Sequence, residues 1–253
     1  MKKKDCYIKT VLGVKVDCTH LDGVLKKVDS WITDSRGKKY IVTPNPEMIV
    51  QAQKDEKFKQ ALNGADIAIT DGVGLVWALR WINRGQKRRI KRITGIKVME
   101  SLCRMADRKN WKVFLLGGGL GVAVQASVKL KQAYQNLQIM GWAGSQNIEK
   151  AEKEEKRKLI KKINEYKPDL LFVAYGHGRQ EKWIAENLGR LNVKVAMGIG
   201  GAFDYIVKPR LRAPKLMREM GLEWLWRLIM QPWRIKRQLA LMKFVWLMLR
   251  SYF

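Results

Sequence analysis

The stretch KVFLLGGGLGVAVQASVKLKQAY, residues 112–134, decides the fold class. A short apolar run is followed by a glycine-rich loop and then by a longer segment whose apolar residues recur at helical spacing. The same succession recurs through the first two thirds of the chain. Strands are predicted at Tyr40–Val42, Ala65–Ile69, Lys112–Leu116, Asp169–Ala174 and Val193–Met197, and helices at Gly74–Ile82, Ile96–Arg108, Val122–Tyr134 and Ile148–Tyr166. This alternation predicts an α/β fold, a Rossmann-like, mostly parallel sheet flanked by helices.

Glycine and polar residues follow these strands. The loops read TPNPE (43–47), TDGVG (70–74), GGGLG (117–121), YGHGRQE (175–181) and GIGGAFD (198–204). Parallel sheets bind ligands beyond the carboxyl ends of their strands, and amides at a following helix start bind phosphate groups. The loops therefore predict a nucleotide-type site. Two simpler interpretations stay open, since GGGLG does not match GxGxxG and is also an ordinary turn, and Asp71 is also suited to capping the next helix.

Metal-ligand patterns are absent from the sequence. The three cysteines, Cys6, Cys18 and Cys103, have no zinc spacing, and they form no even-numbered disulfide framework. The two histidines, His20 and His177, form no cluster, and no Asp-x-Asp pair occurs. We expect no metal and no cofactor, and a chain that works in a reducing cytoplasm.

Positive charge dominates the composition and is accompanied by large apolar residues near the C-terminus. The chain has 50 Lys and Arg against 23 Asp and Glu, a net charge of +27, which predicts an anionic partner. An amphipathic helical pattern begins near Pro214 and is interrupted at Pro232. Basic residues mixed with Trp, Leu and Phe are typical of a helix that lies in a membrane interface. The longest nearly apolar run, Leu239–Leu249, is about half of the roughly 20 residues that a spanning helix needs.

These patterns predict two parts, an α/β core in residues 1–207 and a basic helical appendage for membrane association in residues 208–253. The expected location is peripheral, on the cytoplasmic face of the cell membrane, against anionic lipid. Alternatively, the apolar face of the appendage packs on the core or on a second copy of the chain. Specific nucleic-acid binding is less favoured, because no helix-turn-helix or RNP-like motif appears.

Several motifs, in their order along the chain, resemble the WecG/TagA/CpsF family of bacterial glycosyltransferases, glycosyltransferase family 26. The resemblance covers residues 40–237 and rests on TPNPE, TDGVGLVWA, RITG (92–95), LLGGGLG, GHGRQEKW and GIGGAFDY, followed by RAPKLMREMGLEWLWRL. It implies a metal-independent, inverting enzyme of envelope-polysaccharide or teichoic acid synthesis. Such an enzyme moves a sugar, often N-acetylmannosamine, from a UDP donor to an undecaprenyl-diphosphate-linked sugar.

The resemblance also implies site residues. Asp71, in the family's DGxG motif, is the expected general base. Thr43, in the family's TPN motif, is the second expected catalytic residue and would position donor or acceptor through hydrogen bonds. The residues expected to bind substrate are Asn45, Arg92, Gly117, Gly118, Gly176, Gln180, Arg227, Arg234 and Arg237. The last three match arginines of the family's C-terminal appendage and would neutralise the leaving diphosphate.

Two positions depart from the family pattern. Lys97 stands where the family commonly has an aspartate, and Gly178 stands where GxPxQE usually has its proline. Lys97 either alters the choice of donor or lies on a helix face, and Gly178 loosens its loop. Because of these departures, a catalytically idle scaffold stays an alternative interpretation. Because of the positive charge, a non-catalytic nucleic-acid-binding protein stays another.

Overall fold

The computed structural model describes most of the chain. Described residues are 7–34, 37–84, 90–145, 148–149, 151–209, 212–214, 216–217, 220, 223–230, 232 and 235–252, without the side chains of 224, 227 and 235–238.

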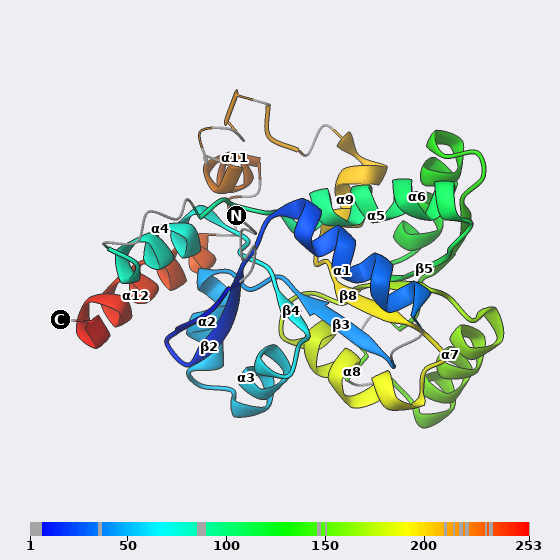
Figure 1. The fold of residues 1–253 in the computed structure, drawn as a ribbon, viewed down its shortest axis with the longest axis horizontal. Helices are drawn as coiled ribbons and strands as arrows, with labels where there is room; N and C mark the ends of the chain where they lie inside the picture. Colours follow the sequence, from blue (N-terminus) through cyan, green and yellow to red (C-terminus); the bar gives the residue numbers. More distant parts are fainter. Residues whose placement is uncertain are drawn as a thin grey trace.

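A six-stranded sheet forms the centre of the molecule (Figure 1). Its strand order is β4 (Ile67–Ala68), β3 (Lys39–Val42), β8 (Val195–Gly198), β7 (Leu170–Ala174), β5 (Lys112–Gly117) and β6 (Gln138–Trp142). Every pairing in it is parallel, which confirms the predicted architecture. β5 and β7 are neighbours in the sheet, but the chain continues from β5 to β6 on one side and from β7 to β8 on the other. In parallel sheets, a point where the connections change direction in this way is where ligands bind.

Helices cover both faces of the sheet. One face carries α1 (Leu21–Thr33), α5 (Gly95–Lys109), α6 (Val122–Ala133) and α9 (Ala202–Val207). The other carries α2 (Pro46–Ala52), α3 (Glu56–Asn63), α7 (Lys153–Tyr166) and α8 (Arg179–Asn187), which ends in the short 3₁₀ helix η1 (Leu188–Arg190). The described residues also form α4 (Val73–Ile82), α11 (Glu223–Met230) and α12 (Ile235–Tyr252).

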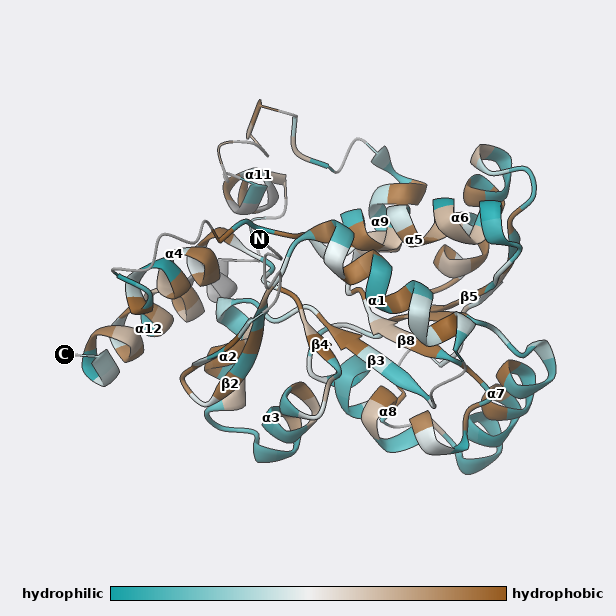
Figure 2. Ribbon diagram, in the orientation of Figure 1, coloured by the Kyte–Doolittle hydropathy of each residue, from teal (hydrophilic) through white to brown (hydrophobic). Residues whose placement is uncertain are grey.

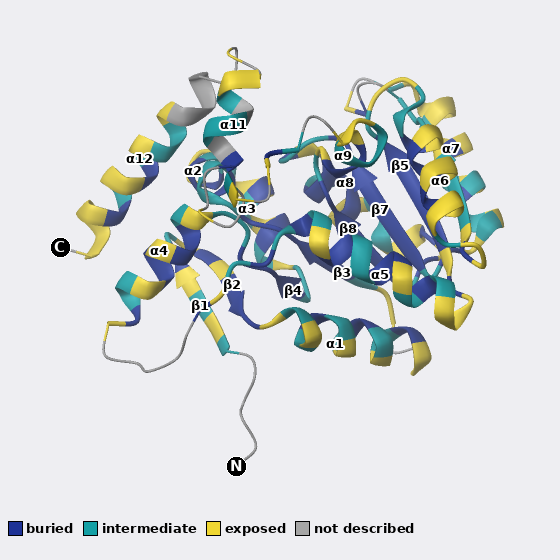
Figure 3. Ribbon diagram, turned by 90° about the horizontal axis from the view of Figure 1, so that it is seen from above, coloured by how far each residue is buried: buried dark blue, intermediate teal, exposed yellow. Residues whose placement is uncertain are grey.

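Alternate residues of each strand feed two separate cores. In β5, Val113 and Leu115 pack under α5 and α6, whereas Phe114 and Leu116 face the opposite layer. A strand covered on both faces has to be apolar throughout, and Figure 3 shows the central strands buried along their length. This explains why the continuous apolar runs were recognisable as strands in the sequence.

An antiparallel hairpin, which we did not predict, precedes the sheet. β1 (Tyr7–Val11) and β2 (Val14–Cys18) meet at Leu12 and Gly13, whose φ angles of 48° and 77° are those of a type I′ turn. Leu-Gly is not the usual Asn-Gly or Asp-Gly signal for that turn. β2 lies beside β4, where the Asp17 carboxylate accepts the Ala68 N–H at 2.8 Å.

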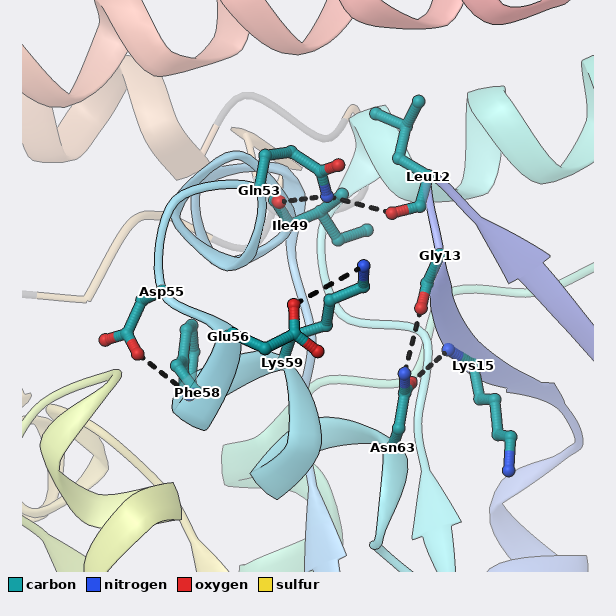
Figure 4. A network of polar contacts seen from close by, with 10 residues as sticks. All are labelled: Leu12, Gly13, Lys15, Ile49, Gln53, Asp55, Glu56, Phe58, Lys59 and Asn63. Atoms are coloured by element: carbon teal, nitrogen blue, oxygen red, sulfur yellow. Dashed lines mark hydrogen bonds and ion pairs between the residues drawn. The ribbon is translucent and has the colours of Figure 1, made fainter.

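Side chains from the α2–α3 region hold the hairpin turn in place (Figure 4). The Asn63 amide accepts the Lys15 N–H at 2.8 Å and donates to the Gly13 carbonyl at 2.9 Å. Gln53 donates to the Leu12 carbonyl at 2.8 Å. The hairpin is therefore fixed against the layer that contains α2.

Other differences from the predicted elements concern the short helices, the edge strand β6 and the N-terminal helix α1. We predicted no bounds for α1, α2, α3, α8 or α9, we did not predict β6, and α7 begins at Lys153 rather than Ile148. The β6 residues are partly exposed, so this strand lacks the continuous buried run of its neighbours. Helices of six to eight residues, such as α9 and α3, show too few turns for their period to stand out.

The C-terminal helix α12 lies beside α2 and α4 (Figure 1). α11 ends at Met230 and α12 begins at Ile235, which confirms the interruption predicted near Pro232. Phe244 and Met248 of α12 are buried in the core that contains α2, so this face packs on the molecule as our alternative interpretation expected. The division into core and appendage stays a prediction.

The outward face of α12 carries many large apolar residues. Figure 2 shows hydrophobic segments along α12 and α4, and the exposed residues include Val73, Trp77, Leu239, Met242, Val245, Trp246 and Leu249. No helix in the described part of the chain is long and apolar enough to cross a membrane.

Candidate active site

Thr43 and Asp71 come together at the carboxyl ends of β3 and β4. The Asp71 carboxylate accepts the Gly95 N–H at 3.2 Å, and Gly95 is the first residue of α5. Gly95 also packs against the buried Thr43, since a Cβ added at Gly95 would lie 3.1 Å from Thr43 Cγ2. This hydrogen bond joins Asp71 to α5 and not to α4, the helix that follows it, whose N-cap is Gly72.

Arg92 connects Asp71 to the C-terminal region. Its Nε lies 3.8 Å from Asp71 Oδ1, and its Nη2 lies 3.0 Å from Glu223 Oε2 at the start of α11. Glu223 is buried, with 9% of its surface exposed. We did not predict Glu223 as a site residue; the available signal was that residues 208–253 contain only two acids, Glu219 and Glu223.

We expect Glu223→Gln to lower turnover roughly 10- to 100-fold, because a guanidinium that loses its charged partner no longer holds one orientation beside Asp71. Glu223→Asp should restore part of the rate. Steady-state kinetics measure the change, with Glu100→Gln as the matched control, since Glu100 also forms an ion pair with the C-terminal region, with Arg212 at 3.1 Å. An equal loss in both variants would contradict a role for Glu223 in placing Arg92.

Asn45 begins α2 at the same edge. Its side-chain oxygen accepts the Met48 N–H at 3.0 Å and so caps the helix, with Pro46 at the first helical position. Gly72 lies beside it, because a Cβ at Gly72 would be 3.7 Å from the Asn45 Cβ. The cap fixes Asn45 next to the Asp71 loop, and its contact with substrate stays a prediction.

Gln180 and Glu181 join the loops after β7 and β8. Gln180 is only 2% exposed; its Oε1 accepts the Gly200 N–H at 3.0 Å, and its Nε2 donates to Glu181 at 2.7 Å. The fully buried Glu181 also accepts the Gly178 N–H at 2.7 Å. We predicted that Gln180 contacts the nucleotide-sugar, and this stays a prediction. The structure shows that Gln180 and Glu181 hold the two loops together, and Glu181 was missed as a site residue.

Gly178, one of the two departures, takes a conformation that proline does not adopt. Its φ is +84°, whereas the proline ring fixes φ near −65°. Its N–H is also the donor to Glu181, and proline has no N–H. This loop is therefore built on glycine, and the hydrogen bond opposes the loosening that we expected.

Burial raises the pKa of Glu181 to about 7, because the effect of burial is larger than the opposing effect of the hydrogen bonds from Gln180 and Gly178. Between about pH 4.5 and pH 7 the folded protein holds a proton that the unfolded chain has released, so the free energy of unfolding falls as pH rises through this window.

The fall attributable to Glu181 should reach roughly 3 kcal/mol at most. Urea unfolding across this pH range should show a flatter profile for Glu181→Gln than for the unmodified protein. Glu186→Gln, an exposed residue of the same helix, should leave the profile unchanged. A profile for Glu181→Gln that parallels the unmodified one would contradict this assignment.

The predicted glycines lie at the ends of β5 and β7. Gly117, Gly118 and Gly176 all have positive φ, at +92°, +80° and +81°. A side chain at Gly117 would approach the Ala174 carbonyl to 3.0 Å, so here glycine allows two loops to lie in contact. These loops follow β5 and β7, the neighbouring strands from which the chain leaves in opposite directions. Their contact with a phosphate stays a prediction.

Three predicted arginines are not tested. Arg234 lies outside the described residues, and the side chains of Arg227 and Arg237 lie outside them too. Lys97 is exposed in the first turn of α5, as in the simpler of its two interpretations. Within the described ranges, no three His, Cys, Asp or Glu side chains gather as a metal site would require.

The fold and this edge define an α/β enzyme with its polar residues beyond the carboxyl ends of a parallel sheet. A family model described as "Glycosyl transferase WecG/TagA/CpsF family" matches residues 9–253. The chain belongs to this family and is a glycosyltransferase, which confirms the resemblance seen in the motifs. Membership also favours an enzyme over the non-catalytic alternatives.

Curated relatives in Staphylococcus aureus carry one name, N-acetylglucosaminyldiphosphoundecaprenol N-acetyl-beta-D-mannosaminyltransferase. The proteins of strains MRSA252 and MW2 are each 30% identical to this chain over 228 residues, which is 90% of this chain and 86% of the relative. The protein of strain NCTC 8325 / PS 47 is similar to the same extent.

Proposed function

We propose that this chain transfers a sugar of the N-acetylmannosamine type from a UDP donor to an undecaprenyl-diphosphate-linked N-acetylglucosamine. The relatives match this chain over 90% of its length, and their name supports this acceptor and this sugar. The observation that carries the chemistry is the cluster of Asp71, Thr43 and Arg92 at one edge of the sheet.

In the proposed reaction, the acceptor hydroxyl attacks the anomeric carbon from the face opposite UDP. The new bond joins the acceptor oxygen to that carbon, the bond to the UDP phosphate oxygen breaks with its electron pair, and the hydroxyl proton passes to Asp71. The configuration inverts because there is one displacement. Arg92, with Arg227, Arg234 and Arg237, would neutralise the charge that develops on UDP, without a metal ion.

The lipid-linked acceptor suggests work at a membrane surface, which we propose to be the cytoplasmic face. The exposed apolar residues of α12 and α4 support this, together with Arg250, whose guanidinium lies 5.4 Å from the Trp246 ring. Basic and aromatic residues on one surface favour anionic lipid. A second copy of the chain stays the alternative partner for this face.

The proposal is tested by UDP release from a panel of UDP-sugars, with and without a short-chain polyprenyl-diphosphate-linked N-acetylglucosamine, in the presence of EDTA. We expect release that requires the acceptor, is highest with UDP-N-acetylmannosamine and is unaffected by EDTA. Release that needs a divalent cation would contradict the metal-independent mechanism, and no release with any donor would contradict the proposal.

A further inference from the structure

A pocket of about 330 Å³ lies between α2 and α12, beside the loop after β7. Its lining residues are Glu47, Val50, Gln51, Lys54, His177, Leu239, Ala240 and Lys243. Residues from α2 and from α12 contribute to it, so it depends on the C-terminal helix being packed where it is. None of its residues was among the predicted substrate-binding set.

Two lysines in this pocket lie next to each other. The charge of Lys54 lowers the pKa of Lys243, as a neighbouring cation does. Within the described part of the chain, no carboxylate forms a salt bridge with either lysine. Glu47 lines the same pocket, but it lies 3.4 Å from His177 Nε2. An anion between the two ammonium groups would therefore relieve their repulsion.

Part of the lining is apolar and continues onto an exposed surface. Val50, Leu239 and Ala240 line the pocket, and Leu239 is 56% exposed. From Leu239 the outward face of α12 continues through Met242 and Trp246. A free phosphate ion would use only the lysines, whereas a phosphate attached to a hydrocarbon chain would use both surfaces.

The pocket also lies close to the candidate active site. α2 begins at Asn45 and Pro46, and Pro46 packs against Gly72 and Gly74 next to Asp71. α2 ends at Ala52, so its seven residues span roughly 10 Å at the rise of a helix, and Lys54 follows its end by two residues. One extended lipid-linked ligand is long enough to reach both places.

We propose that Lys54 and Lys243 bind the phosphate group of a lipid-linked ligand in this pocket. This inference rests on the proposed function for its lipid. The phosphate belongs either to the polyprenyl-diphosphate acceptor or to an anionic phospholipid, and the two sources are separated by experiment.

The test measures binding rather than turnover, so that it can be read even if no sugar is transferred. Lys54→Gln/Lys243→Gln in the full chain is compared with the unmodified protein and with Lys54→Arg/Lys243→Arg. The control variant is Lys158→Gln/Lys161→Gln, which removes the same charge from the exposed face of α7. Calorimetry measures the affinity for a short-chain polyprenyl diphosphate, and sedimentation measures binding to vesicles of anionic or zwitterionic phospholipid.

We expect the double glutamine variant to weaken binding about 10- to 100-fold, and the arginine variant to retain it. Weaker binding of the polyprenyl diphosphate alone assigns the site to the acceptor; weaker binding of anionic vesicles alone assigns it to phospholipid. If neither affinity falls further than in the control variant, the site is wrong. Circular dichroism verifies that each variant is folded.

Discussion

Asp71→Asn should lower acceptor-dependent transfer about 10²- to 10⁴-fold while the fold is retained. Asparagine keeps an oxygen that can accept the Gly95 N–H, the contact that Asp71 makes at 3.2 Å, so α5 should stay in place. It has no carboxylate to take the proton from the acceptor hydroxyl. Turnover at saturating substrate concentrations reports the loss of the base, and the melting temperature, measured on the same variant, reports any loss of stability.

The matched control for this variant is Asp66→Asn. Asp66 precedes the same strand, β4, and accepts the Tyr40 N–H at 3.0 Å at the opposite edge of the sheet. Asp66→Asn should leave turnover nearly unchanged when both variants are folded to the same extent. Equal losses of activity in the two variants would show that Asp71 acts through stability and not as the base.

Gly178→Pro should destabilise the protein by about 3 kcal/mol or more. A φ of +84° is incompatible with the proline ring, and the hydrogen bond to the buried Glu181 would be lost. For a chain of this length such a loss corresponds to a fall in melting temperature of roughly 6–12 °C. Differential scanning calorimetry measures it.

Gly178→Ala is the comparison for the proline variant. Alanine keeps the N–H, although the positive φ strains it and its Cβ would lie 2.7 Å from the flexible end of Gln51. Its melting temperature should fall less than that of the proline variant. If proline were tolerated as well as alanine, the loop would not depend on this glycine and its N–H.

The elements that were predicted most clearly from the sequence are the buried strands and most of the longer helices that connect them. Lys112–Gly117 and Leu170–Ala174 are apolar because both faces are covered, and their glycine loops mark the edge where ligands bind. The hairpin Tyr7–Cys18 escaped prediction because its positive φ angles fall on Leu-Gly. The hairpin is held beside β4 by the Asp17 carboxylate, which accepts the Ala68 N–H, and nothing in the sequence around Asp17 indicates this hydrogen bond.

The candidate site divides in the same way. Asp71, Thr43 and Arg92 were predicted as members of one site through the family's motifs, and the structure brings them together. Glu223 was not, because it lies 131 residues from Arg92 and only the folded chain joins them. Glu181 was not predicted as a site residue, because what makes this glutamate unusual is its burial, which the sequence does not show.

The most direct test of the account is the mass of the lipid product formed by the unmodified enzyme from UDP-N-acetylmannosamine and a short-chain polyprenyl-diphosphate-linked N-acetylglucosamine. The account predicts an acceptor heavier by one N-acetylhexosamine residue, an equal amount of UDP, and neither product with Asp71→Asn. UDP released while the acceptor mass stays unchanged would contradict it.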